Sequence, residues 1–171
     1  FKTGQYMSRE VVKTSSPSMD IQVASNFERL LFDAFNRSSS EINEKMNNFK
    51  INGNICVTSE NLDFCQSYFS SEKVDMKSVE KVIIETYETD GYLVDPHTAI
   101  GIHASRQSQQ IENNFILGTA HPVKFLDTVE DSIQSKTNLL NGYERLFEAT
   151  EKFDSLNNSV DEVKLKIESS N

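Results

Sequence analysis

The segment from Ser25 to Phe35 restricts the fold of this chain more than any other. Its apolar residues recur at spacings of three and four, so on a helix they form one continuous stripe: Phe27, Leu30, Leu31, Ala34 and Phe35. The residues from Ser25 to Glu28 have the form of a capping box, which predicts that the helix begins there. A stripe this wide has to be buried, so the chain must fold around a hydrophobic core.

Signals that start and stop helices recur along the rest of the chain. Further helices are predicted to begin after caps at Ser38, Ser59, Asp75, Asp95 and Ser159, at Pro122, and around Leu139 to Phe153. Predicted stops lie near Gly53, at Asp90 and Gly91, and at about Gln109. The segments Glu10–Thr14 and Asn114–Leu117 have the composition of strands. We therefore expect about eight helices and only two or three short strands.

Length and charge limit the classes of function. The chain has 171 residues and a net charge of −9, which suits a single folded domain and argues against binding to nucleic acid. No apolar run is long enough to span a membrane and no signal peptide is visible, so a cytoplasmic location is expected. Cys56 and Cys65 are too few for a disulfide framework and are expected to be reduced and buried. The chain begins at Phe1 without an initiator methionine, which suggests a fragment.

Common catalytic motifs do not occur in the sequence. His97 and His103 are six residues apart, which places them on different faces of a helix, and no metal-binding motif accompanies them. A nucleophile elbow, a P-loop and a dinucleotide fingerprint are also missing. The many carboxylates are best interpreted as solvated helix faces.

The stretch from Phe115 to Leu126 is the best candidate for a functional site. It is predicted to form a strand, a turn at Gly118 and Thr119, and a helix whose first turn contains Lys124. A cation there is disfavoured by the helix dipole, and a bound phosphate or carboxylate would resolve the conflict. Alternatively, Lys124 pairs with Asp127 or extends into water. The hydroxyl of Thr119 could equally be an ordinary turn or cap group.

Five short segments, taken together and in this order, resemble the C-terminal part of the threonine synthase family. They are Thr3 to Tyr6, Ser16 to Ile21, Ser25 to Leu31, Asp95 to Ala99, and Gly118 to Phe125. The resemblance extends from about Thr3 to Ile133. It implies one segment, residues 1–135, from the catalytic domain of a pyridoxal-phosphate enzyme, followed by a helical, charged tail over residues 136–171. The implied fold is an α/β fold of the tryptophan-synthase-like type (fold type II), of which this mainly helical segment holds few short strands.

The resemblance also implies a reaction and a set of site residues. The family converts O-phospho-L-homoserine and water into L-threonine and phosphate, with pyridoxal 5'-phosphate as cofactor. By this resemblance Thr119 contacts the pyridine nitrogen of the cofactor, and Ser16, Ser18 and Asp20 shape the same cleft. Lys124 either binds an anion near the substrate phosphate or fixes the turn. Two residues within the matched motifs can each be interpreted in two ways. Arg29 either holds an anion or pairs with Asp33, and His121 either caps the helix or lines the site.

In this family the Schiff-base lysine and the loop that cradles the cofactor phosphate precede the first matching motif. We therefore expect both to lie upstream of Phe1, in a missing N-terminal part of the same fold. The chain alone is then expected to be inactive and not to bind the cofactor covalently. The alternative is a noncatalytic helical module with a binding or regulatory role, derived from the same fold.

Overall fold

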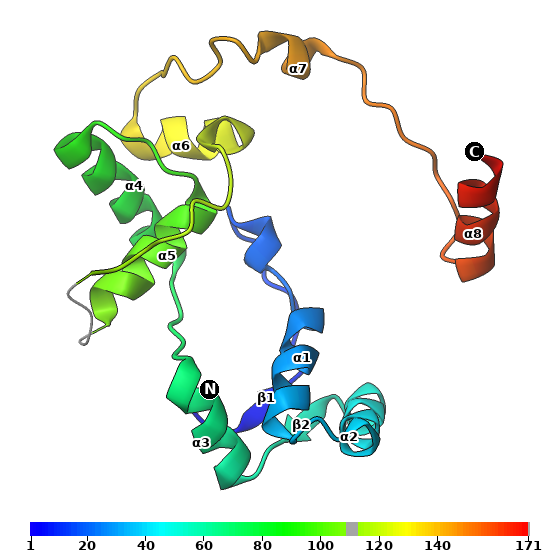
Figure 1. Ribbon diagram of the computed structural model, residues 1–171. Coiled ribbons are helices and arrows are strands. Elements are labelled where there is room, and N and C mark those ends of the chain that lie inside the picture. Colours follow the sequence, from blue (N-terminus) through cyan, green and yellow to red (C-terminus); the bar gives the residue numbers. More distant parts are fainter. Residues whose placement is uncertain (109–112, 171) are drawn as a thin grey trace. The chain divides into compact units, whose positions relative to one another are not determined.

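The computed structural model describes residues 1–108 and 113–170, which form two compact units, Phe1–Thr137 and Asn138–Asn171. The first unit is mostly helical (Figure 1). Its elements are β1 (Gln5–Met7), the 3-10 turn η1 (Pro17–Met19), α1 (Ser25–Ala34), α2 (Ser39–Asn52), β2 (Asn54–Cys56), α3 (Ser59–Tyr68), α4 (Met76–Asp90), α5 (Pro96–Gln107), the 3-10 turn η2 (Pro122–Phe125) and α6 (Leu126–Ile133). The second unit contains α7 (Glu144–Glu148) and α8 (Val160–Ser169).

Most of the predicted helix caps are confirmed. The side chains of Ser38, Asp75 and Asp95 accept hydrogen bonds from backbone N–H groups in the first turns of α2, α4 and α5. Gly53 and Gly91 end α2 and α4 in the left-handed conformation, with φ of +68° and +64°. Helix α5 ends at Gln107, and its predicted end at Gln109 lies outside the described residues.

Four helix boundaries differ from the prediction. The residues Pro122–Phe125, predicted to start a helix, form the 3-10 turn η2, and α6 begins only at Leu126. Helix α1 is preceded by Ala24 in an extended conformation, so Ser25 is its first residue and does not cap it. Helix α3 is capped by Thr58, whose hydroxyl accepts from Asn61 N, rather than by Ser59. The helix expected around Leu139 to Phe153 is only Glu144–Glu148, because Gly142 before it has φ +87° and the residue after it is extended.

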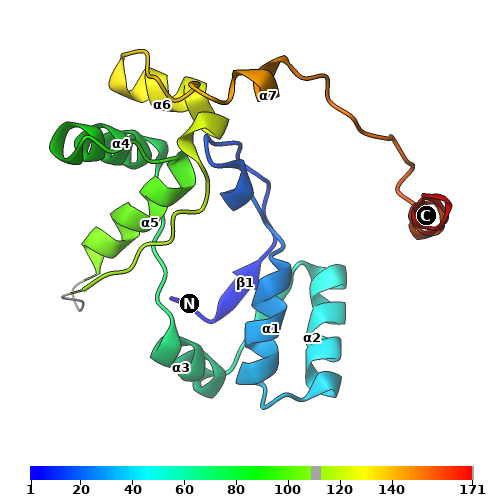
Figure 2. The ribbon, with the colours of Figure 1, turned by 45° about the horizontal axis from the view of Figure 1, so that its top comes forward.

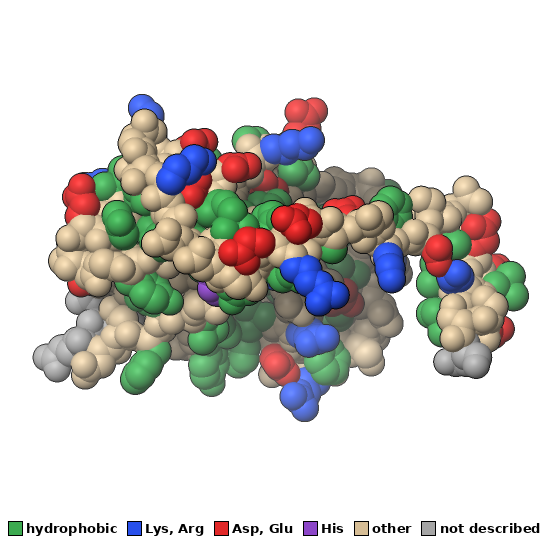
Figure 3. Space-filling view, turned by 90° about the horizontal axis from the view of Figure 1, so that it is seen from above, with side chains coloured by type: hydrophobic (Ala, Val, Ile, Leu, Met, Phe, Trp, Pro, Cys, Tyr) green, Lys and Arg blue, Asp and Glu red, His purple; other side chains and the backbone are tan. Residues whose placement is uncertain are grey.

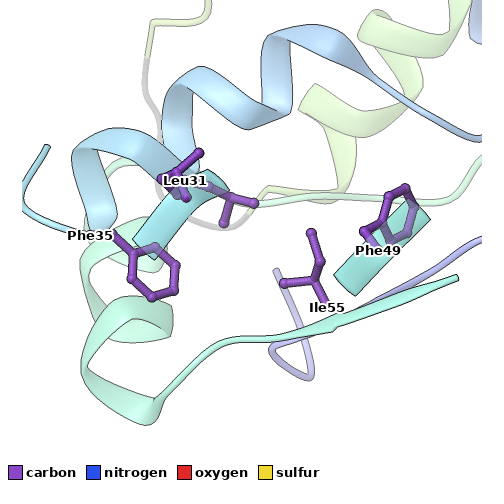
Figure 4. Packing of buried hydrophobic residues seen from close by; sticks show 5 residues of the cluster. Leu31, Phe35, Phe49 and Ile55 are labelled. Atoms are coloured by element: carbon purple, nitrogen blue, oxygen red, sulfur yellow. The ribbon is translucent and has the colours of Figure 1, made fainter. Parts of the chain in front are cut away.

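The C-terminal half of the predicted stripe of α1 is buried, whereas Phe27 and Leu30 are half-buried. Leu31 and Phe35 of this helix region pack with Ile42, Phe49 and Ile55, and each of the five is at most 7% exposed (Figure 4). The ring of Tyr6 in β1 stacks on Phe49 with the ring centroids 4.9 Å apart. Helices α1 and α2 lie side by side, and α2 also contacts β2 (Figure 2). The requirement for a core, inferred from periodicity, is confirmed.

The strands lie elsewhere than predicted. The sheet of the described chain consists of β1 and β2, which pair antiparallel with Tyr6 opposite Ile55. The segments Glu10–Thr14 and Asn114–Leu117 are not strands. Both have strand-like composition, but within residues 1–108 and 113–170 neither has a neighbouring strand to pair with, so Val12 and Phe115 are exposed. Cys65 is buried as expected, whereas Cys56 in β2 is exposed.

Helices α4, α5 and α6 form the other part of the first unit. Helix α4 packs against both α5 and α6 (Figures 1 and 2). Their contact faces include the side chains of Val82, Ile83, Ala99 and Val129, which are 2% exposed or less. This packing places the N-terminal end of α5 and the turn before η2 in one rigid framework.

A buried carboxylate closes the loop that follows α6. Glu130 is 7% exposed and accepts hydrogen bonds from Lys136 Nζ at 2.6 Å, Thr137 N at 2.8 Å and Thr137 Oγ1 at 3.1 Å. The hydrogen bond from the Lys136 ammonium, followed by the one from the Thr137 amide, lowers the pKa of Glu130 below its usual value. The ionised form is therefore favoured in the folded chain.

This lowered pKa predicts a pH-dependent contribution to stability. The contribution is complete above the usual glutamate pKa and is lost as the pH falls through the lower pKa of the folded state. We expect the difference in unfolding free energy between the wild type and Glu130→Gln to be largest near neutral pH and to shrink between about pH 5 and pH 3. Urea denaturation at several pH values measures it, with the exposed Glu88→Gln as control. A difference that stayed constant over this range would contradict the prediction.

The second unit has its own local contacts. Ser159 caps α8 by accepting from Glu162 N, as predicted, and Lys166 pairs with Asp154 at 2.6 Å. Apolar side chains of α8, including Val160 and Leu165, are more than 60% exposed. This unit is therefore stabilised by capping and ion pairing rather than by a core of its own.

Two surface properties complete the description. On the face of the molecule shown in Figure 3, lysine and arginine side chains are interspersed with aspartate and glutamate, so positive charge is not concentrated there. Among the described residues, none of the helices combines the length and apolarity needed to cross a membrane.

Candidate functional site

The N-terminal end of α5 is organised by the buried carboxylate of Asp95. This side chain is fully enclosed, and Oδ1 accepts from His97 N at 2.9 Å and lies 3.0 Å from His97 Nδ1. Oδ2 accepts from Thr98 N at 3.4 Å and from the hydroxyl of Thr98. Because an ionised carboxylate only accepts hydrogen bonds, every one of these contacts has its proton on the partner.

His97 connects α5 to the loop around η1. Its Nε2 accepts a hydrogen bond from Ser18 N at 3.2 Å, so the ring proton resides on Nδ1 and is donated to Asp95. The imidazole also packs against the ring of Phe125 in η2, with the ring centroids 4.7 Å apart. A single buried side chain therefore contacts the loop before α1 and the turn before α6.

Thr98 connects α5 to the turn that contains Thr119. The amide of Thr119 donates to Thr98 Oγ1 at 3.1 Å, and the two threonine hydroxyl oxygens are 3.4 Å apart. Just upstream, Ile116 crosses Gly101 so closely that a Cβ atom at position 101 would lie 3.2 Å from its side chain. The lack of a side chain at Gly101 therefore allows this close approach.

Three of the segments that resemble the family thus meet at one place. The loop of Ser16 to Asp20, the start of α5, and the turn from Gly118 to Phe125 are joined by the side chains of His97 and Thr98 on the shared carboxylate of Asp95. At this junction Ser18 and Thr119 are exposed. Two exposed residues that carry hydroxyl groups are therefore connected to one buried carboxylate.

The candidate residues of the η1 loop have different environments. Ser18 is exposed, but Ser16 is only 1% exposed, and its Oγ is the buried side-chain oxygen that lacks a hydrogen-bond partner among the described residues. Asp20 accepts from Thr14 N and Thr14 Oγ1, both at 2.8 Å. Asp20 therefore holds the loop in shape, and Ser16 faces the interior.

Lys124 is exposed in the turn η2, and within residues 1–108 and 113–170 it forms no ion pair. The alternative pairing with Asp127 is therefore not found. His121 caps η2, because its Nδ1 accepts from Val123 N at 3.2 Å. This geometry favours the capping interpretation of His121.

Asp33 pairs with a different arginine from the one considered in the sequence. Arg37, one turn further along the chain, donates to Asp33 at 2.9 Å, and the alternative pairing of Asp33 with Arg29 is not found within residues 1–108 and 113–170. Arg29 is exposed on α1.

Sequence reasoning did not identify Asp95, His97 and Thr98 as the centre of the site. The helix-start pattern predicts Asp95 as a cap, the histidine spacing gives His97 no metal site, and the resemblance includes both residues without assigning either a role. The available signal was the presence of two polar side chains in the first turn after Asp95, which can both reach back to its carboxylate. Their second partners, Ser18 and Thr119, are 79 and 21 residues away in sequence and could not be inferred from spacing.

Other features of the described residues do not compete with this junction. No group of three histidine, cysteine, aspartate or glutamate side chains in the described chain could hold a metal ion. An apolar hollow of about 280 Å³ lies between α1, α3 and the strands, and none of the candidate residues lines it.

Several known proteins have sequences similar to that of this chain. Residues 98–167 match the family model described as threonine synthase, C-terminal. A threonine synthase from Pseudomonas aeruginosa is 40% identical over 133 residues, which are 76% of this chain and 28% of that protein. One from Corynebacterium glutamicum is 32% identical, over 96% of this chain and 36% of that protein.

Solved structures agree with the sequence matches. The crystal structure of threonine synthase from Brucella melitensis with bound pyridoxal phosphate superposes with a TM-score of 0.83 and 34% identity, over 98% of this chain and 36% of that one. Yeast threonine synthase gives a TM-score of 0.78 and 29% identity, over 98% and 38% of the two chains. The chain thus spans about a third of the length of these proteins. By sequence and by structure, the chain is homologous to the C-terminal region of threonine synthases.

Proposed function

We propose that this chain is the C-terminal part of a threonine synthase, a lyase that converts O-phospho-L-homoserine and water into L-threonine and phosphate. The observation that carries the proposal is the junction at Asp95, which joins three family-like segments and holds the exposed hydroxyl of Thr119. Homology over most of the chain supports the same assignment.

Thr119 is the proposed contact of the cofactor. Pyridoxal phosphate, when bound, withdraws electrons from the substrate through its pyridine ring. A hydroxyl group is a suitable partner for the ring nitrogen because it can donate a hydrogen bond to it. Thr119 is exposed, and its hydroxyl oxygen lies 3.4 Å from Thr98 Oγ1, well beyond the usual O–H···O distance, so its proton is available.

The proposed substrate contacts are Lys124 in η2 and residues of the loop around η1. Lys124 carries an exposed ammonium group without an ion pair in the described chain, which suits the phosphate of the substrate. Ser18 presents a second exposed hydroxyl, while Ser16 and Asp20 shape the loop that carries it. The Schiff-base lysine and the loop for the cofactor phosphate are proposed to come from an N-terminal part of the same fold.

The remaining assignments follow from the same proposal. Residues 1–135 would contribute to the catalytic domain and residues 136–171 would form a helical, charged tail. The protein would act in threonine biosynthesis in the cytoplasm. The competing proposal is a noncatalytic binding or regulatory module derived from the same fold.

Assaying the natural gene product that contains residues 1–171 separates the two proposals. With pyridoxal phosphate it is expected to release phosphate from O-phospho-L-homoserine. Thr119→Val should lower kcat/KM by about 10- to 100-fold, because one hydrogen bond to the cofactor ring is lost. Thr119→Ser retains the hydroxyl and should keep most of the activity.

Two results would contradict these expectations. The absence of phosphate release from the natural gene product would favour the noncatalytic module.

For residues 1–171 alone, titration with pyridoxal phosphate should give no specific visible absorption band. A saturable band that disappeared in Thr119→Val would show that the isolated chain already forms the cofactor site.

A further inference from the structure

We propose that Thr98 is a positioning residue for Thr119, and that the buried carboxylate of Asp95 sets the direction of the hydrogen bonds between them. The inference rests on the proposed role of Thr119 as the cofactor contact. Thr98 itself is 9% exposed and would not touch the cofactor.

The direction of the hydrogen bonds follows from the chemistry of the groups. Asp95 Oδ2 can only accept, so the single hydroxyl proton of Thr98 is donated to it. Thr98 Oγ1 is then an acceptor for every other partner, and it receives the amide proton of Thr119 at 3.1 Å. A hydroxyl without the carboxylate behind it could rotate and offer its proton to the turn instead.

The donation of the Thr98 proton to Asp95 also limits which hydrogen bonds the hydroxyl of Thr119 can form. It can donate to Thr98 Oγ1 but cannot accept from it, because the proton of Thr98 is already used. At 3.4 Å the contact between the two oxygens is weak, so the Thr119 proton loses little when it turns to a better acceptor. The geometry therefore keeps Thr119 in place by its amide while leaving its hydroxyl free to donate to a ligand.

Few other contacts hold the turn. Across residues 113–120 of the described chain, the hydrogen bonds are those of Thr119 to Thr98. A Cβ atom at Gly118 would meet nothing within 4 Å, and the side chain of Thr119 is exposed. Packing of Ile116 on Gly101 fixes the approach to the turn but not the position of Thr119 itself.

Amide hydrogen exchange of residues 1–171, followed by NMR, tests the positioning without cofactor. The amide of Thr119 is expected to exchange about tenfold or more slowly than that of Gly118, because only the former has an acceptor. Thr98→Val should remove most of this protection and shift the Thr119 amide resonance, and Thr98→Ser should restore both. Thr86→Val is the matched control, since Thr86 is equally buried at 8% but donates to Val82 O within α4.

Cofactor binding to the natural gene product gives the second readout. Thr98→Val is expected to raise the dissociation constant of pyridoxal phosphate about tenfold, and Thr98→Ser to restore it, as measured by fluorescence titration. A Thr119 amide that exchanges as fast as that of Gly118 in the wild type would overturn the positioning role, and so would unchanged protection in Thr98→Val. If Thr98→Val does not fold, the wild-type protection and the Thr98→Ser variant decide the question.

The two proposals can fail separately. If Thr119 is protected through Thr98 but Thr119→Val retains full activity, the positioning role stands and the proposed cofactor contact is wrong.

Discussion

Replacing Asp95 with alanine is expected to destabilise the chain by about 3–5 kcal/mol, because it removes a helix cap and leaves buried donors without an acceptor. The donors are His97 N, His97 Nδ1, Thr98 N and the hydroxyl of Thr98, all within an enclosed site. The loss should also free Ser18 and Thr119, which are held through His97 and Thr98. Urea denaturation followed by circular dichroism measures the change in unfolding free energy.

Asp95→Asn is the matched control for this prediction. The amide oxygen of asparagine can still cap α5, but its amino group would face one of the donors, so an intermediate loss is expected. Equal stability of Asp95→Ala and the wild type would show that the network at the start of α5 contributes little to folding.

Leu31→Ala is expected to destabilise the chain by about 2–5 kcal/mol, through lost apolar burial and the cavity left behind. Leu31 is 1% exposed and lies in the cluster with Phe35 and Ile55, which draws on α1, α2 and β2 (Figure 4). A rigid cluster of aromatic and branched side chains cannot collapse fully into the space of a leucine side chain. The same denaturation experiment measures the effect.

The control for Leu31→Ala is Leu165→Ala on α8. Leu165 is 64% exposed, so its removal should change the unfolding free energy by less than about 0.5 kcal/mol. Similar losses for the two variants would mean that the cluster around Leu31 is not the core of the first unit.

Local sequence patterns were sufficient for most of the helices. Asp75 and Gly91 mark the start and end of α4 within a few residues, because capping and the left-handed stop depend on neighbouring residues only. The extended segments were predicted less well. Val11 and Val12 favour a strand by their shape, but a strand exists only where another strand pairs with it, and composition says nothing about that partner.

The candidate site was predictable in part. The resemblance named Thr119 and Ser18, and the structure shows both exposed at one junction. The resemblance did not indicate which side chains hold Ser18 and Thr119 at this junction. Lys124 was singled out by a conflict between its charge and the helix dipole. Lys124 is exposed, and its assignment to the substrate phosphate stays a proposal.

The sequence by itself determined that the chain is mainly helical, where most helices begin and end, and which family its motifs resemble. These properties depend on periodicity, capping and short segments, which are local. Only the tertiary structure decided that Asp95, His97 and Thr98 join segments 79 and 21 residues away into one site. Hydrogen bonds of this kind arise from the packing of α5 against the loops beside it, and no local pattern encodes which distant group will meet a buried carboxylate.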